Sequence, residues 1–216
     1  MPFVIIGGIF AAIIIIGVIA WRLDKKRTEA FQAFATRNNF SFQKNPGSFP
    51  RACGGFDLFN AGHSKRQYNL MSGESGGIRL SIFDYKYTTG SGKHQTTHHQ
   101  TVCLIEDPKV SIPRCFVRHE IGLFDWLGQK FGMQDIDFDD DPAFSKMFVL
   151  KSGVEDRVRQ AFGPKLRGVL VANSARFRTC EAEGGALLVN TGRRIKAEDL
   201  IPLMQFAFDI RNTVGV

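Results

Sequence analysis

An uncharged apolar stretch near the amino terminus constrains this chain more than any other feature. Residues 3–21, FVIIGGIFAAIIIIGVIAW, are nineteen residues long, with eight isoleucines and no charge. As a helix rising about 1.5 Å per residue, the stretch is about 28 Å long, close to the hydrocarbon thickness of a bilayer. The sequence therefore predicts a single transmembrane anchor followed by a folded domain of about 190 residues.

A cleaved secretory signal is the alternative explanation of this stretch. Val18-Ile19-Ala20 would be a weak cleavage site, but Trp21 and a basic cluster follow it directly, as at the end of a membrane span. The excess of basic residues on this side predicts that the C-terminal domain lies in the cytoplasm and the short N-terminus outside. The residues of this basic collar are Arg22, Lys25, Lys26 and Arg27.

Small residues along one flank of the predicted span suggest a partner helix. Gly7, Gly8, Ala11 and Ala12 repeat at a spacing of four. Lipid provides no hydrophobic drive for helices to associate, so close backbone approach over small residues is a main route to packing. The alternative is that these residues are simply common in membrane helices. We expect other membrane subunits to contact this flank.

The charge of the chain is concentrated beside the anchor. The net charge is +7, and residues 22–27 alone contribute +3. Anionic lipid headgroups attract such residues by about 1 kcal/mol each. Nucleic-acid binding would require a basic stripe with aromatic residues away from the anchor, and the sequence has none. The collar therefore predicts contact with anionic lipid and no nucleic-acid partner.

The remaining sequence predicts an α+β fold with a mostly antiparallel sheet and packed helices. No Gly or Pro occurs at residues 18–45, so the first helix is expected to continue to about Arg37 and to end at Asn38-Asn39. Such a rigid extension would hold the folded domain at a fixed height above the bilayer. Three regions are expected: the anchor and collar (residues 1–27), a helix with a β-rich subdomain (28–107) and an α+β subdomain (108–216).

Alternating apolar residues predict several strands in the β-rich part. Residues 40–42, 56–59 and 68–71 are short candidates, and residues 78–106 form the strongest predicted hairpin. In its first arm Ile78, Leu80 and Ile82 share one face. The aromatic residues at 83, 85 and 87 share the other, which predicts that both faces of the hairpin are at least partly covered.

The C-terminal part is expected to mix helices and strands. Strands are expected at residues 112–117 and 147–150, and a hairpin at 176–190 across Gly184-Gly185. Four helices are expected: at residues 120–131, after Ser152, after Pro164, and from near Asp199. In the second, Ser152 and Glu155 would form a capping box and Val154 would face inward.

Two groups of side chains could bind a metal ion. His94, His98 and His99 lie within six residues, but neighbouring residues of a strand point to opposite faces. A zinc site would therefore need His63, His119 or a cysteine, brought close by the fold, to complete it. The alternative is a polar hairpin with solvated histidines.

The acidic loop of residues 135–141 has the spacing of an EF-hand at its start. It has Asp140 where that motif needs Gly and Lys146 where it needs Glu. A looser cation site, a solvated loop that caps the turn before Pro142, and contact with a basic partner remain the alternatives. No metal or cofactor is predicted.

No pattern of catalytic residues is present. The sequence has no G-x-S-x-G motif and no phosphate-binding loop, and its cysteines at 53, 103, 115 and 180 form no C-x-x-C pair. Reduced, mostly buried thiols are expected in a cytoplasmic domain. Asp84 lies between two aromatic residues of a predicted strand, but one carboxylate does not make a mechanism. We expect no enzymatic activity and no catalytic residue.

Several segments resemble a family of uncharacterised bacterial single-span inner-membrane proteins with a cytoplasmic α+β domain. They are the N-terminal span, RTEAFQAFATRNNFSF, FDYKYTTGSGKHQTTHHQTV, IDFDDDPAFSKMFVLKSG with VEDRVRQAF, and EAEGGALLVNTGR. The resemblance covers most of residues 22–210. It implies a bacterial inner-membrane location and a shared fold, and it supplies no catalytic residue.

These observations favour a non-catalytic, membrane-anchored accessory or scaffold subunit of a larger membrane protein complex. A photosynthetic or respiratory energy-converting complex is one candidate host. The alternative is a membrane-tethered domain that senses a ligand or metal through the histidine hairpin or the acidic loop. A hydrolase with an unrecognised site around Asp84 is the third hypothesis.

Overall fold

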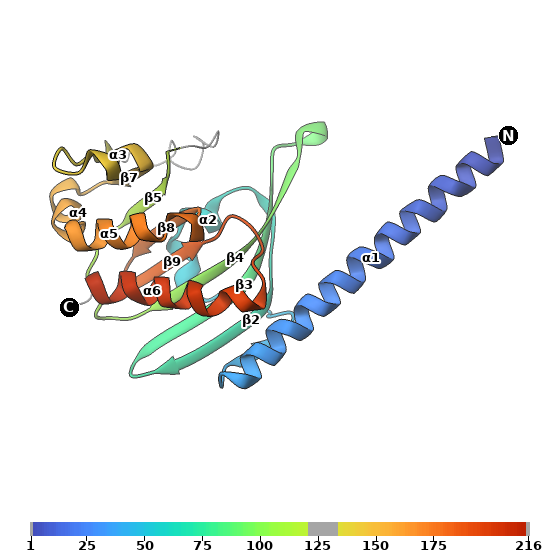
Figure 1. Cartoon of the computed structure of the whole chain (residues 1–216), viewed down its shortest axis with the longest axis horizontal. Helices are drawn as coiled ribbons and strands as arrows, with labels where there is room; N and C mark the ends of the chain where they lie inside the picture. Colours follow the sequence, from blue (N-terminus) through green and yellow to red (C-terminus); the bar gives the residue numbers. More distant parts are fainter. Residues whose placement is uncertain (1, 121–133, 215–216) are drawn as a thin grey trace.

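The structure is a computed structural model, which describes the backbone of residues 2–120 and 134–214 and the side chains of residues 12–120 and 135–214. Helix α1 (Pro2–Arg37) is continuous over 36 residues. Its first part stands clear of the folded body and its last part lies against it (Figure 1). The extension to Arg37 is confirmed, and Asn39 ends the helix with a left-handed φ of 57°.

Within the described part of the chain, no helix is both long enough and apolar enough to cross a membrane.

The predicted span at residues 3–21 lies partly outside the residues whose side chains are described. Its first nine residues, with Gly7, Gly8 and Ala11 of the small-residue flank, fall there. The described apolar run covers residues 12–21 and is followed directly by the charges of residues 22–27. Ala12 is exposed.

One antiparallel sheet forms the body of the molecule. Within the described residues it has nine strands, in the order β1-β2-β3-β4-β9-β8-β5-β7-β6. The strands are β1 (Ser41–Gln43), β2 (His63–Ser75), β3 (Ile78–Thr89), β4 (Thr96–Glu106), β5 (Cys115–His119), β6 (Gln134–Asp135), β7 (Phe148–Ser152), β8 (Thr179–Glu183) and β9 (Ala186–Asn190). The two subdomains were expected to meet near residues 107–112. Strand β4, before this point, pairs with β9, after it, so one sheet contains strands of both.

Alternation along the central hairpin divides the core between the two faces of the sheet, as predicted. Leu80 and Ile82 belong to the larger apolar cluster. Phe83, Tyr85 and Tyr87 belong to a smaller cluster on the opposite face. The β3–β4 register pairs residues 79–89 with residues 106–96 without a shift, so the alternation is kept along both strands.

Helices cover both faces unequally. The larger cluster includes buried residues of the end of α1, of α3 (Pro142–Met147), α4 (Glu155–Ala161), α5 (Pro164–Ala172) and α6 (Leu200–Val214). The 3-10 helix Arg51–Gly55 and α2 (Asp57–Asn60) cover the smaller cluster. Figure 1 shows α5 and α6 on one side of the sheet and α2 on the other.

Three sequence predictions are wrong in detail. Residues 56–59 were expected to be a strand, but Asp57–Asn60 is a helical turn because its first backbone N–H groups bind a buried carboxylate of β8. Ser152 belongs to β7 and does not cap the helix α4. Val154 is exposed rather than inward.

The other predicted elements of the C-terminal part are present where the structure describes them. The hairpin β8–β9 turns at Gly184 and Gly185, both at positive φ, where glycine has no steric penalty. The α6 side chains Leu203, Phe206 and Ile210 are buried as expected. The helix expected at 120–131 lies outside the described residues beyond its first position.

Candidate functional site

A buried polar group with several hydrogen-bond partners joins α1 to the centre of the sheet. Asp84 of β3 is fully buried, and Arg27 of α1 contacts it at both carboxylate oxygens, with Nε–Oδ2 at 2.7 Å and Nη2–Oδ1 at 2.6 Å. The Arg27 side chain is 14% exposed. This fork-to-fork geometry is the strongest form of a charged hydrogen bond, and its partners are 57 residues apart.

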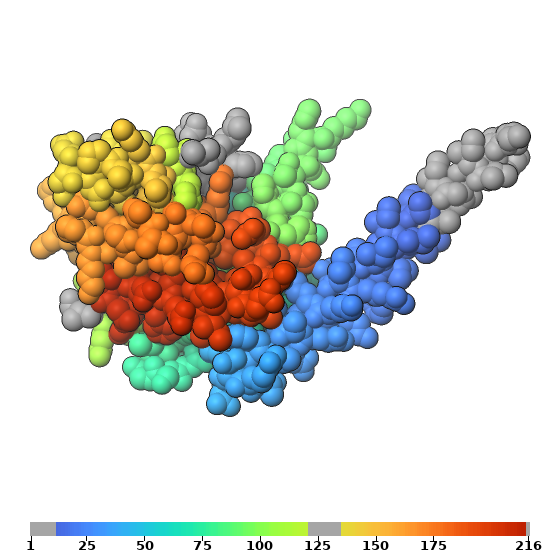
Figure 2. Space-filling model, viewed as in Figure 1, coloured from blue at the N-terminus to red at the C-terminus, as the bar shows by residue number. Residues whose placement is uncertain are grey.

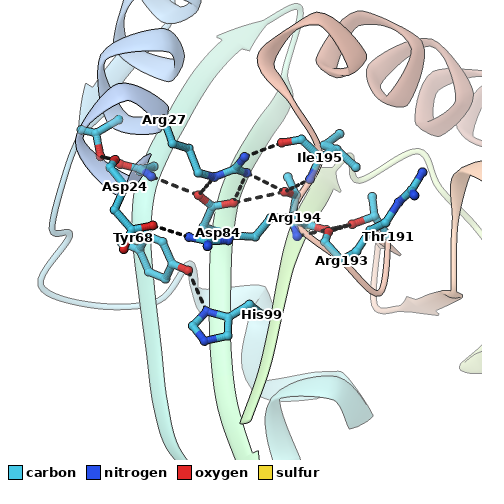
Figure 3. A network of polar contacts seen from close by, with 12 residues as sticks. Asp24, Arg27, Tyr68, Asp84, His99, Thr191, Arg193, Arg194 and Ile195 are labelled. Atoms are coloured by element: carbon cyan, nitrogen blue, oxygen red, sulfur yellow. Dashed lines mark hydrogen bonds and ion pairs between the residues drawn. The ribbon is translucent and has the colours of Figure 1, made fainter. Parts of the chain in front are cut away.

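Three further groups complete the environment of this ion pair. Thr101 of β4 donates its hydroxyl to Asp84 Oδ1 at 3.1 Å, and Asn69 of β2 donates its amide to Oδ2 at 3.0 Å. Arg27 also donates to the carbonyl oxygen of Ile195 at 2.5 Å. Figure 3 shows Arg27 extending from the helix toward Asp84 and Ile195. The two charges are thus surrounded by hydrogen-bonding groups from three separate segments.

Arg27 therefore does not belong to the exposed collar in which it was predicted. It directly follows Lys26 in the chain but lies on the face of α1 that meets the sheet. Its guanidinium lies above the ring of Phe31, 4.4 Å from the ring centroid. Arg22, Lys25 and Lys26 are exposed, as a surface collar requires. The sequence alone cannot distinguish Arg27 from the three exposed basic residues, because the distinction depends on which face of the helix is buried.

A pocket of about 280 Å³ lies beside this ion pair, in the angle between α1 and strands β2–β4. Asp24 of α1 and Arg194 form one wall through a contact of 2.6 Å. The Tyr68 hydroxyl is 3.3 Å from Nδ1 of His99, and Figure 3 shows this pair on the far side of the ion pair from α1. The lining residues are Asp24, Thr28, Lys44, Asn45, Arg66, Tyr68, Asn69, Lys86, His99 and Arg194.

Positive charge dominates the pocket and affects its histidine. Burial lowers the pKa of His99, and the charges of Arg194 and Lys86 lower it further. Neutral imidazole is therefore the form of His99 at pH 7, so it adds a hydrogen-bonding group to the pocket rather than a fifth cation. The sequence could not reveal this pocket, because its cations come from β1–β2, β3 and the β9–α6 connection.

The histidine hairpin is divided by the sheet, as its strand geometry predicted. His98 stacks on Tyr87 with ring centroids 4.7 Å apart, whereas His99 lines the basic pocket on the other face. His94 is exposed in the hairpin loop. Within the described residues, no three His, Cys, Asp or Glu side chains are arranged to hold a metal ion.

The acidic loop binds a buried arginine of this chain. Asp140 and Asp141 contact Arg167, which is 3% exposed, at 2.6 and 3.3 Å. Arg167 holds the pKa of Asp140 below its ordinary value through this hydrogen bond. Asp141 also accepts a hydrogen bond from the Phe144 N–H at 3.1 Å and caps α3. This contact corresponds to the alternative in which the loop caps the turn at Pro142. The loop thus has a structural role in this part of the molecule.

A second buried carboxylate lies on the smaller cluster. Glu181 of β8 accepts the backbone N–H groups of Asp57 and Leu58 at 2.6 and 3.2 Å. Burial raises its pKa to about 8, assisted by the nearby Asp57 carboxylate. Arg114 is 2.7 Å from Asp57. Sequence reasoning missed this group because nothing local distinguishes Glu181 from a solvent-facing strand residue.

All four cysteines are buried and form no disulfide. Burial raises the pKa of Cys53, Cys103 and Cys115 to about 12, and that of Cys180 well above its ordinary value. None is a thiolate near neutral pH, so none is an activated nucleophile.

No known protein family and no curated protein matches this sequence. One solved structure resembles the fold of this chain. The crystal structure of the mycobacterial trehalose monomycolate transport factor A, TtfA, aligns with a TM-score of 0.65 over 87% of this chain and 93% of that one, at 11% sequence identity. This likeness shows that the two proteins share a fold.

Proposed function

We propose that this protein is a non-catalytic accessory subunit, attached to a membrane by the first part of α1 and bound there to a larger protein complex. The observation that carries the proposal is a run of exposed apolar side chains on a helix whose other end is fixed in the core. The orientation with the folded domain in the cytoplasm is part of the proposal.

The exposed apolar segment of α1 is too large to be ordinary protein surface. Its described part, residues 13–23, has eight large apolar side chains that are 45–66% exposed. Soluble monomers rarely expose contiguous apolar patches of more than a few hundred Å². In Figure 2 the described part of this segment projects away from the rest of the molecule. Bilayer lipid, together with partner helices, would supply the apolar surroundings that it lacks.

The other end of α1 is part of the domain core. Phe31 and Ala35 are fully buried in the larger cluster, and Arg27 is held by Asp84. The helix has no break between these residues and the apolar segment. A helix fixed in this way would transmit the position of the membrane segment to the domain, which suits a subunit that presents a surface at a set height.

The shared fold with TtfA supports an accessory role. The name of that protein assigns it to trehalose monomycolate transport. A transport complex therefore joins the energy-converting complex as a candidate host. The buried, protonated cysteines support the non-catalytic part of the proposal.

The second candidate is a membrane-tethered ligand sensor, and the basic pocket beside α1 favours it. Ligand binding there would be compatible with an accessory role, because the pocket is formed by the same junction that fixes the helix.

Co-purification from native membranes tests the accessory role. After gentle solubilisation, the full-length chain should migrate with partner proteins well above its own mass of 24.1 kDa. Gly8→Leu combined with Ala12→Leu should release those partners, because the larger side chains prevent close helix approach. Ala33→Leu, on an exposed site of the same helix, is the matched control. A parent protein that runs as a monomer would contradict the proposal.

A further inference from the structure

The pocket beside α1 holds more positive charge than the protein itself neutralises. Four cationic side chains line it, and Asp24 is the carboxylate among its lining residues. Asp24 is bound by Arg194. Within the described residues, Lys44, Arg66 and Lys86 have no carboxylate at ion-pair distance. Three cations thus face a hollow of about 280 Å³ without a counter-charge from the chain.

The strand register brings two of these cations together. Arg66 of β2 is directly opposite Lys86 of β3, and Lys86 is opposite His99 of β4. Like charges directly opposite each other on neighbouring strands destabilise a sheet. Such an arrangement becomes favourable when an anion lies between the two side chains.

The pocket is also next to the exposed apolar segment. Leu23 is the last exposed apolar residue of that segment. Asp24 and Thr28, one and five positions later, line the pocket. At about 1.5 Å per residue, the pocket wall begins within about 8 Å of the apolar segment along the helix. If the segment enters a bilayer, the pocket lies at the depth of the lipid headgroups.

We propose that this pocket binds a phosphate ester, with Arg66, Lys86 and Lys44 as the groups that contact the phosphate. A phosphate carries up to two charges and several acceptor oxygens, so it can neutralise cations arriving from separate strands. The arginine fork matches two of its oxygens, and the lysines act as point charges. The ester is either a soluble phosphate compound or the headgroup of an anionic lipid; the lipid source rests on the proposed membrane attachment.

The soluble source is tested by calorimetric titration of the full-length protein in detergent with glycerol 3-phosphate and with glycerate. Glycerate carries a carboxylate in place of the phosphate, so it should bind more weakly. Arg66→Gln combined with Lys86→Gln should weaken glycerol 3-phosphate binding about tenfold or more, because two charged hydrogen-bond donors are lost.

The matched control is Lys65→Gln. Lys65 is an exposed cation on the same strand, directly before Arg66, and it does not line the pocket. It should leave the affinity within about twofold. The melting temperature of the double variant without ligand should equal or exceed that of the parent, because the like-charge pair is removed. This separates a binding defect from misfolding.

The lipid source is tested by co-sedimentation with vesicles. Vesicles of phosphatidylcholine alone test attachment through the apolar segment, and vesicles with phosphatidylglycerol in about a 7:3 ratio test the pocket. Only the second kind should distinguish the double variant from Lys65→Gln. Loss of binding to both kinds would count against the proposed membrane attachment, while the glycerol 3-phosphate titration would still test the pocket.

The outcomes decide both the proposal and the source of the ligand. If the double variant weakens binding of glycerol 3-phosphate, the pocket binds a soluble ester. If it weakens binding to the phosphatidylglycerol vesicles, the pocket binds a lipid headgroup. Equal affinities for glycerate and glycerol 3-phosphate, equal effects of the double and control variants, or no binding of either phosphate probe would each overturn the proposal.

Discussion

At the scale of single residues, the stability of the domain depends on the pairing of Arg27 with Asp84. Both groups are removed from most of the solvent, and a charge left alone in such a place is strongly unfavourable. Burying the pair need not stabilise the fold more than apolar residues would, but breaking it leaves one charge uncompensated. The ion pair therefore fixes where α1 meets the sheet.

Asp84→Asn should lower the free energy of unfolding by about 3–5 kcal/mol, because the Arg27 guanidinium keeps its charge and loses its partner. Urea unfolding of the full-length protein in detergent measures this. Glu29→Gln is the control on the same helix, since the Lys25–Glu29 pair is exposed at 3.9 Å, and its effect should stay below about 1 kcal/mol. Equal effects of the two variants would show that the buried pair is not a main contact.

Glu181 should make stability depend on pH. Its pKa is raised from 4.5 to about 8 in the folded protein, so between these values the folded state holds a proton that the unfolded state releases. The contribution of Glu181 to the free energy of unfolding should therefore be complete below about pH 4.5 and fall as the pH rises to 8, by an amount on the order of a few kcal/mol.

Glu181→Gln should remove most of the fall in the free energy of unfolding with pH. Unfolding experiments at pH 5, 6, 7 and 8, which cover about the range in which Glu181 titrates, measure this. Burial also raises the pKa of Asp57 above its ordinary value, which acts on stability in the same direction. Parallel curves for the variant and the parent protein would mean that Glu181 does not titrate in this range.

At the scale of elements, α1 combines two parts with different surroundings. Its last turns bury Phe31, Phe34 and Ala35, whereas the described part before Leu23 exposes its apolar side chains. Phe31→Ala should lower the free energy of unfolding by about 3–5 kcal/mol, because it leaves a cavity at a site with no exposure. Gln32→Ala, at the neighbouring exposed position, should have almost no effect in the same assay. A small effect of Phe31→Ala would mean that α1 can leave the domain.

Elements with a strong local pattern could be predicted from the sequence. The hairpin at 78–106 alternates over its whole length, and the Gly184-Gly185 turn has the chemistry that a tight hairpin needs. Residues 56–59 could not be predicted correctly, because their apolar composition also suits a strand. The partner that favours a helical turn there, Glu181, is more than 120 residues away.

The candidate site was predicted only in fragments. Asp84 and His99 were noticed, but Arg27 was placed in the collar and Arg66 was not singled out. Their association depends on the crossing of α1 over the sheet and on the β2–β3 register. Neither is encoded in a local spacing, so a buried ion pair and a basic pocket between distant segments become visible only in the fold.

At the scale of the whole molecule, one helix links an exposed apolar segment to the centre of a nine-stranded sheet within the described residues (Figures 1 and 2). The basic pocket lies in the angle between this helix and strands β2–β4. This arrangement explains why charge, apolar surface and the buried ion pair occur within a few turns of one helix. It also makes membrane attachment the claim on which the proposed role depends.

Alkaline carbonate extraction of native membranes, followed by flotation, tests that attachment most directly. The full-length protein should float with the membranes, and Ile15→Arg combined with Val18→Arg should move it to the soluble fraction, because the two charges face the apolar surroundings of the segment. Release of the unaltered protein by carbonate would contradict the account.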